Sequence, residues 1–190
     1  MIAVTIDEAW PGFGDSFTVA DLDRMPSDGH RYELVDGALV VSPRPTTVHQ
    51  FVAMRLASAL DHACPEGLSV LAEPAVHIDQ VTELAPDLVV VRLEDVGGAK
   101  FTVPPLLVVE VRSPSTALID LTRKKAVYEK FGVPSYWIVD PEPARPELTV
   151  FELRDGGNAL EATSTRPLTV SYPFTVTVAP ADLVKGLLRR

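Results

Sequence analysis

Two apolar runs decide the fold, Pro86-Asp87-Leu88-Val89-Val90-Val91 and Leu107-Val108-Val109-Glu110-Val111. Both are short, nearly continuous and rich in valine, which is typical of strands that are covered on both faces. Each run carries one acidic residue, Asp87 directly before the first and Glu110 near the end of the second. The sequence therefore predicts two central strands of a covered sheet, with a carboxylate on each.

These two acids are the first candidates for chemistry. A carboxylate in a buried strand is costly unless it is paired or binds a cation. If the strands are neighbours, the two carboxylates come together and either share a proton or hold a metal ion. Oxygen ligands of this kind suit Mg²⁺ or Mn²⁺. Glu33 adds a third acid, and Lys124 could stabilise negative charge that develops at such a site.

Each candidate also has a purely structural interpretation. Asp87 follows a proline and could cap a turn, and Glu110 could pair with Arg92 or Arg112. Taken singly, the other candidates are typical of surface or helix-cap positions: Glu33, His49, Lys124 and Lys125. Only the combination of these residues favours a metal-binding catalytic site over the structural interpretations.

The rest of the chain predicts one α/β domain around a mixed sheet flanked by helices. Asp36-Gly37 joins two β-prone runs and indicates a hairpin over residues 31–41. A helix capped by Thr46 or Thr47 ends near Cys64, and a second helix covers residues 118–131. A second hairpin is expected over 148–165 and a last helix over 181–188. We assign residues 1–17 to an irregular leader and 18–190 to a single domain.

Composition narrows the class of protein. The 190 residues are 46% hydrophobic and contain one cysteine, so neither an internal disulfide nor a cysteine-rich zinc module is possible. No apolar stretch is long enough for a membrane span and no secretory signal is present, so we expect a cytoplasmic protein with no membrane partner. The net charge of −9 argues against broad, non-specific binding of nucleic acids.

Several blocks of sequence match a known family. Pro86-Asp87 followed by Glu110-Val111-Arg112 is similar to the bipartite signature of the PD-(D/E)xK nucleases. Over residues 19–184 the chain resembles the Uma-two family of restriction-endonuclease-like proteins. The blocks that carry this resemblance are Arg31-Tyr32-Glu33-Leu34-Val35-Asp36-Gly37, His49-Gln50, Val109-Glu110-Val111-Arg112-Ser113-Pro114-Ser115-Thr116, Asp120-Leu121 with Lys124 and Tyr128, and Tyr136-Trp137-Ile138-Val139-Asp140-Pro141.

The resemblance implies a restriction-endonuclease-like core, in which a mixed central β-sheet is flanked by helices and carries accessory β-hairpins. It implies that Mg²⁺, or Mn²⁺ in its place, supports hydrolysis of DNA. Asp87, Glu110 and the backbone carbonyl of Val111 would be the metal ligands, and Glu33 an additional catalytic acid. The usual lysine position holds Arg112, which cannot exchange a proton, so Lys124 on the following helix is expected to take that role.

Two other functions stay open. The chain could be a catalytically silent nuclease fold that binds DNA or protein, or a metal-dependent phosphodiesterase acting on a substrate other than nucleic acid. Nucleases of the restriction type commonly cut as dimers, so we expect a homodimer, with the hairpin over 148–165 as the candidate interface. The excess of acidic residues predicts a nuclease that binds DNA weakly without metal and loses activity steeply with salt.

Overall fold

The computed structural model describes residues 16–113, 120–154 and 157–187. Its centre is a six-stranded sheet with the strand order β10-β9-β8-β7-β6-β3. Neighbouring strands are antiparallel except β7 and β8, which are parallel, so the sheet is mixed as predicted. The strands are β3 (Leu68–Ala72), β6 (Leu88–Arg92), β7 (Leu107–Val111), β8 (Ser135–Asp140), β9 (Glu147–Arg154) and β10 (Gly157–Ser164).

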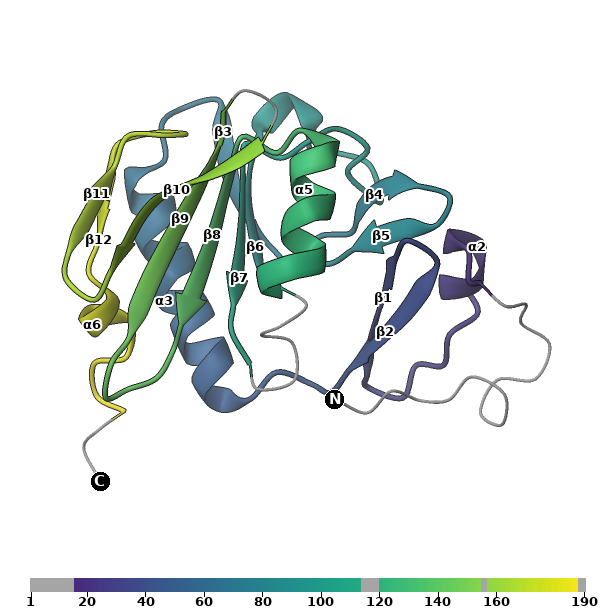
Figure 1. Cartoon of the computed structure of the whole chain (residues 1–190), viewed down its shortest axis with the longest axis horizontal. Helices are drawn as coiled ribbons and strands as arrows, with labels where there is room; N and C mark the ends of the chain where they lie inside the picture. Colours follow the sequence, from purple (N-terminus) through teal and green to yellow (C-terminus); the bar gives the residue numbers. More distant parts are fainter. Residues whose placement is uncertain (1–15, 114–119, 155–156, 188–190) are drawn as a thin grey trace.

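Helices cover both faces of this sheet (Figure 1). Because side chains alternate along a strand, Leu88 and Val90 of β6 pack on the face covered by α3. Val89 and Val91 pack on the opposite face, which α5 covers. Burial on both sides explains why β6 and β7 are almost continuously apolar. The helices are α2 (Val19–Leu22), α3 (Thr47–Ala63), α5 (Lys125–Phe131) and α6 (Pro180–Leu183), with a short 3₁₀ turn, η1 (Leu93–Asp95).

A smaller antiparallel sheet lies beside α5 (Figure 1). Its order is β2-β1-β5-β4, and its strands are β1 (Arg31–Val35), β2 (Ala38–Ser42), β4 (Val76–Asp79) and β5 (Thr82–Leu84). The predicted hairpin is β1 and β2, and both Asp36 and Gly37 have positive φ, as this tight turn requires. Val35 and Leu84 share a hydrophobic cluster with Tyr128 of α5, so this sheet packs onto the α5 face of the large one.

The helix predicted over residues 118–131 differs from the structure. Its first two residues lie outside the described part of the chain. Residues Asp120–Lys124 form a π-helical turn, η2, and only Lys125–Phe131 is α-helical. Gly132 ends the helix with φ 89°, as predicted. Local sequence does not distinguish π from α geometry, and π turns are frequent at functional sites.

Other boundaries were predicted less well. The last helix, expected over 181–188, is the shorter α6, and the described residues after it up to 187 form a turn. The short strand β5 and the strand β11 (Leu168–Val170) were not predicted, whereas β12 (Val176–Val178), with which β11 pairs, lies within the element expected over 174–178. Phe17, assigned to the leader, is fully buried against Val19 and Leu34. Among the described residues, no helix is both long and apolar enough to cross a membrane.

Candidate active site between the two sheets

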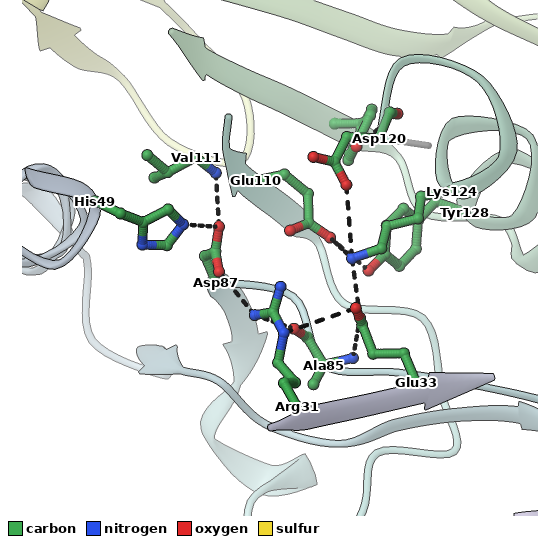
Figure 2. A network of polar contacts seen from close by, with 11 residues as sticks. Arg31, Glu33, His49, Ala85, Asp87, Glu110, Val111, Asp120, Lys124 and Tyr128 are labelled. Carbon is green, nitrogen blue, oxygen red and sulfur yellow. Dashed lines mark hydrogen bonds and ion pairs between the residues drawn. The ribbon is translucent and has the colours of Figure 1, made fainter. Parts of the chain in front are cut away.

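A buried cluster of charged and polar side chains lies where the small sheet meets the α5 face of the large one (Figure 2). We refer to it as the polar cluster. Its members come from β1, α3, the loop before β6, β7, η2 and α5, and all except Arg31 are buried. They are Arg31, Glu33, His49, Asp87, Glu110, Asp120, Lys124 and Tyr128.

The two acids of the apolar runs are neighbours across the sheet. Leu88 of β6 pairs with Val109 of β7 in antiparallel register. Continuing that register by one residue sets Asp87 opposite Glu110. Figure 2 shows the Glu110 carboxylate between Asp87 on one side and Lys124 on the other. The juxtaposition expected for adjacent strands is therefore present.

Lys124 binds three of the acids. Its Nζ donates to Glu33 Oε1 at 2.9 Å and to Glu110 Oε1 at 3.1 Å, and lies 3.6 Å from Asp120 Oδ1. Its side chain is 0% exposed. Tyr128 adds a hydrogen bond from its hydroxyl to the same Glu110 oxygen at 3.2 Å.

The other two basic candidates point elsewhere. Lys125 lies 3.8 Å from Glu129 on the same helix. Arg112 follows β7 and donates to Asp140 at the end of β8. The structure thus brings Lys124, and neither Lys125 nor Arg112, to the carboxylates.

Asp87 is held on both of its oxygens. Oδ1 accepts a hydrogen bond of 3.0 Å from Arg31 Nη1. Oδ2 accepts one of 2.7 Å from the Val111 backbone N–H and lies 3.0 Å from His49 Nε2. The predicted contribution of Val111 was its carbonyl. Its amide is what contacts Asp87, and the carbonyl remains a predicted ligand.

Glu33 reaches the cluster from the small sheet. Its Oε1 accepts a hydrogen bond of 2.9 Å from the Ala85 N–H in addition to the one from Lys124. Arg31 lies two residues earlier on β1, on the same side of the strand, and its Nε is 3.7 Å from Glu33 Oε2. The hairpin therefore supplies one acid and one base to the same cluster.

Four members of the polar cluster were not selected from sequence as site residues. Arg31 stands two residues before Glu33 on a predicted strand, and this spacing indicated that both side chains lie on the same face. Asp120 and Tyr128 stand four residues on either side of Lys124, which indicated a shared helix face. His49 was interpreted as a cap or a packed edge residue. Its backbone N–H is indeed capped by Thr46 Oγ1, but its side chain contacts Asp87.

Burial and charge shift the pKa of Glu110 upward. Desolvation raises it most, and the neighbouring carboxylates raise it further against the attraction of Lys124, so that the pKa lies well above its ordinary value. The pKa of Lys124 is also raised, because the surrounding carboxylates outweigh the effect of burial. Lys124 is therefore a permanent cation, and Glu110 takes up a proton more readily than Glu33 or Asp87.

The pKa values of Asp87 and Glu33 move the other way. Burial alone would raise the pKa of Asp87, but the hydrogen bond and charge of His49, with Arg31 and the Val111 N–H, lower it. For Glu33, Lys124 and Arg31 similarly outweigh burial and lower the pKa. These two acids are ionised at neutral pH.

The polar cluster gathers carboxylates that a divalent cation would stabilise. Glu33, Asp87, Glu110 and Asp120 lie close to the cations Arg31 and Lys124. Ionised carboxylates held this close together in a buried site repel one another. Oxygen ligands that surround a dication relieve that repulsion. The chemistry of the donor set thus suits Mg²⁺, with Asp87 and Glu110 as the adjacent carboxylates.

In the structure, however, the basic side chains of the polar cluster occupy the space between its carboxylates. Within residues 16–113, 120–154 and 157–187, no group of three or more His, Cys, Asp or Glu side chains is arranged as a metal centre. The reason is visible in Figure 2, where Lys124 separates Glu33 from Glu110 and Arg31 covers Asp87. A metal ion would share these carboxylates with the basic side chains.

Comparison with known proteins adds to this geometry. The Uma2 family model, described as "Putative restriction endonuclease", matches residues 19–179. A crystal structure of a putative nuclease from Anabaena variabilis is similar to this one with a TM-score of 0.72. The two chains are 16% identical, and the match covers 88% of this chain and 97% of the other. No curated protein matches the chain.

The structural likeness confirms the restriction-endonuclease-like fold expected from the sequence, with its mixed sheet and flanking helices. The family model spans most of the chain and includes every member of the polar cluster. The protein therefore belongs to the Uma2 family of restriction-endonuclease-like proteins.

Proposed function

We propose that this protein is a metal-dependent endonuclease that hydrolyses phosphodiester bonds of DNA. The observation that carries the proposal is the pair of buried carboxylates, Asp87 directly before β6 and Glu110 on the neighbouring β7, set opposite each other. A buried lysine donates to one of them. Membership of a family described as restriction endonucleases supports the same reaction.

The residues of the polar cluster divide into two roles. Asp87, Glu110 and the Val111 carbonyl would hold Mg²⁺ or Mn²⁺, which supplies a Lewis acid and an acidified water when bound. Asp87 is kept ionised and oriented by Arg31, His49 and the Val111 N–H. Glu110 is oriented by the Tyr128 hydroxyl and Lys124.

Lys124 provides the positive charge. Its ammonium group is held by Glu33 and Glu110 and is a permanent cation in this site. A fixed cation in a desolvated site stabilises the negative charge that develops on a phosphate under attack by water. Glu33 acts by holding this ammonium group, since one of its oxygens binds both Lys124 and the Ala85 N–H.

The test is nicking of supercoiled plasmid with Mg²⁺ or Mn²⁺. Asp87→Asn, Glu110→Gln and Lys124→Met should each lower the rate by about a hundredfold or more, the size expected when one charge-stabilising group is removed. Lys125→Met is the matched control, because Lys125 is the next residue in the chain but pairs with Glu129. It should cut like the wild type. Equal rates in all variants, or none above a mock purification, would contradict the proposal.

The same proteins also test the alternative of a silent nuclease fold. That alternative is favoured by the fact that Lys124 and Arg31 already bind the carboxylates. A protein that gains no thermal stability with Mn²⁺ and never nicks DNA would support it. Turnover of a small phosphodiester without any cleavage of DNA would instead support a phosphodiesterase. The homodimer, with the β9–β10 hairpin as its candidate interface, stays a prediction that sedimentation would check.

A further inference from the structure

A pocket of about 350 Å³ opens beside the polar cluster. It lies at the N-terminus of α3, where Val48 and His49 line it, and at the ends of β7 and β8, where Arg112 and residues 140–143 line it. His49 lines the pocket and is also a member of the polar cluster, because its Nε2 lies 3.0 Å from Asp87 Oδ2. Whatever occupies the pocket therefore lies next to a predicted metal ligand.

Two polar atoms of the pocket-lining residues lack a hydrogen-bond partner. They are His49 Nδ1 and Arg112 Nε, both buried and unpartnered among the described residues. The His49 side chain is only 9% exposed. Because a carboxylate can only accept, His49 Nε2 donates to Asp87. The guanidinium Nε of Arg112 is a donor, and buried polar groups of this kind require partners.

The walls of the pocket suit a flat, largely neutral ring. Val48, Pro141 and Pro143 give apolar surface. The carboxylates of Asp140 and Glu142 outnumber the single guanidinium of Arg112, which already pairs with Asp140. An excess of carboxylates disfavours a phosphate group, but accepts hydrogen bonds from the amino group of a base.

We propose that this pocket binds one unpaired nucleobase that carries an exocyclic amino group, close to the bond that is cut. Glu142 accepts from the amino group, and Arg112 Nε donates to a ring nitrogen or carbonyl oxygen. Guanine presents both features on one ring. The whole base must leave its stack to enter a pocket of this kind. The inference rests on the proposed nuclease function, and it assigns single-stranded or locally melted DNA as the preferred substrate.

Binding of labelled oligonucleotides tests the pocket independently of cleavage. The probes are a single-stranded oligothymidylate, the same strand with one central guanine, and that strand with an abasic site in its place. Fluorescence anisotropy in Ca²⁺, with EDTA in parallel, gives the affinities. The wild type should bind the guanine strand about tenfold more tightly than either of the others, within the range of one bidentate base contact.

Three variants test whether the preference for guanine arises in this pocket. Val48→Trp fills the pocket and should abolish the preference for guanine. Met54→Trp is the matched control, since Met54 lies further along α3 and is 69% exposed, and it should retain the preference. Glu142→Ala, in an exposed loop where misfolding is not expected, removes the acceptor oxygens and should lose the preference while still binding oligothymidylate.

The outcomes separate the two proposals. Equal affinity of the wild type for all three probes, or no binding at all, overturns the proposal that the pocket binds a base, even if plasmid is nicked. So does a guanine preference that survives in both Val48→Trp and Glu142→Ala. A guanine preference that these two variants lose establishes the pocket, and does so even if no variant cuts DNA, in which case the nuclease function alone has failed.

Discussion

The two faces of the central sheet are built from different chemistry. On the α3 face, a large apolar cluster contains Leu56, Leu88 and Trp137, and the buried Ser135 beside it accepts a hydrogen bond from the Trp137 indole. On the α5 face, Glu110 and Lys124 are buried beside the apolar cluster that contains Val108 and Tyr128. Both faces derive from the same strands, because alternate residues of β7 point in opposite directions.

This difference indicates what each face contributes. Burial of apolar area stabilises the fold directly. Burial of ion pairs is weak evidence for stability, because desolvation offsets much of the attraction, although removal of one partner is strongly destabilising. The apolar clusters of both faces therefore supply the stability that allows the α5 face to hold its carboxylates for another purpose. The predictions below test that division.

The largest loss of stability should follow from breaking the polar cluster at its centre. Lys124→Met leaves the Glu33 and Glu110 carboxylates without their cation and should lower the free energy of unfolding by about 3–5 kcal/mol. Lys125→Met removes a partly exposed pair with Glu129 and a cation–π contact with Phe151, and should change the free energy of unfolding by about 1 kcal/mol. Urea unfolding at neutral pH measures both, and equal effects would contradict the central place of Lys124.

A change on the apolar face should separate stability from activity. Leu56→Ala removes a fully buried side chain of α3 and should cost about 2–5 kcal/mol of unfolding free energy. Because Leu56 belongs to the apolar cluster and not to the polar cluster, the nicking rate per folded molecule should stay unchanged. A folded Leu56→Ala protein that no longer nicks plasmid would show that the two faces are not independent.

Binding of a metal ion to the polar cluster should raise the free energy of unfolding. At a Mn²⁺ concentration of about a hundred times its Kd, the free energy of unfolding should rise by about 2.7 kcal/mol. The increase should persist in Leu56→Ala and disappear in the double variant Asp87→Asn/Glu110→Gln. Thermal denaturation with and without Mn²⁺ provides the measurement. A gain that survives in the double variant would place the metal outside the polar cluster.

The smallest expected effect concerns how the free energy of unfolding changes with pH. Glu110 and Glu33 should contribute to this pH dependence with opposite signs. The pKa of Glu110 is raised in the folded state, so its contribution to stability is complete below the ordinary value of 4.5 and is lost as pH rises through the folded pKa. The pKa of Glu33 is lowered, so its contribution is complete above 4.5 and is lost as pH falls through the folded pKa.

Two isosteric variants measure these signs by urea unfolding at a series of pH values. Relative to the wild type, Glu110→Gln should become more stable as pH rises, and Glu33→Gln should become less stable. Parallel pH profiles for the two variants would mean that the pKa shifts do not have opposite directions.

Much of the site could be anticipated because its residues stand at positions with a local meaning. Asp87 and Glu110 interrupt apolar strands, where an unpaired charge is costly. The Asp36-Gly37 turn fixed the hairpin that carries Glu33. His49 was missed as a contact of Asp87, since its place at a helix start has an ordinary structural explanation. The π turn η2 was missed because no local pattern distinguishes it from an α-helix.

By itself, the sequence determined the two covered strands, the hairpin turn and the capped helix α3, since hydrophobic periodicity, turn chemistry and helix capping act over a few residues. Only the tertiary structure decided which basic groups reach which acids. Lys124 and Glu33 are 91 residues apart in the chain, and Arg31 and Asp87 are 56 apart. Such contacts depend on how the small sheet and η2 pack onto the α5 face of the large sheet, and no local pattern encodes that packing.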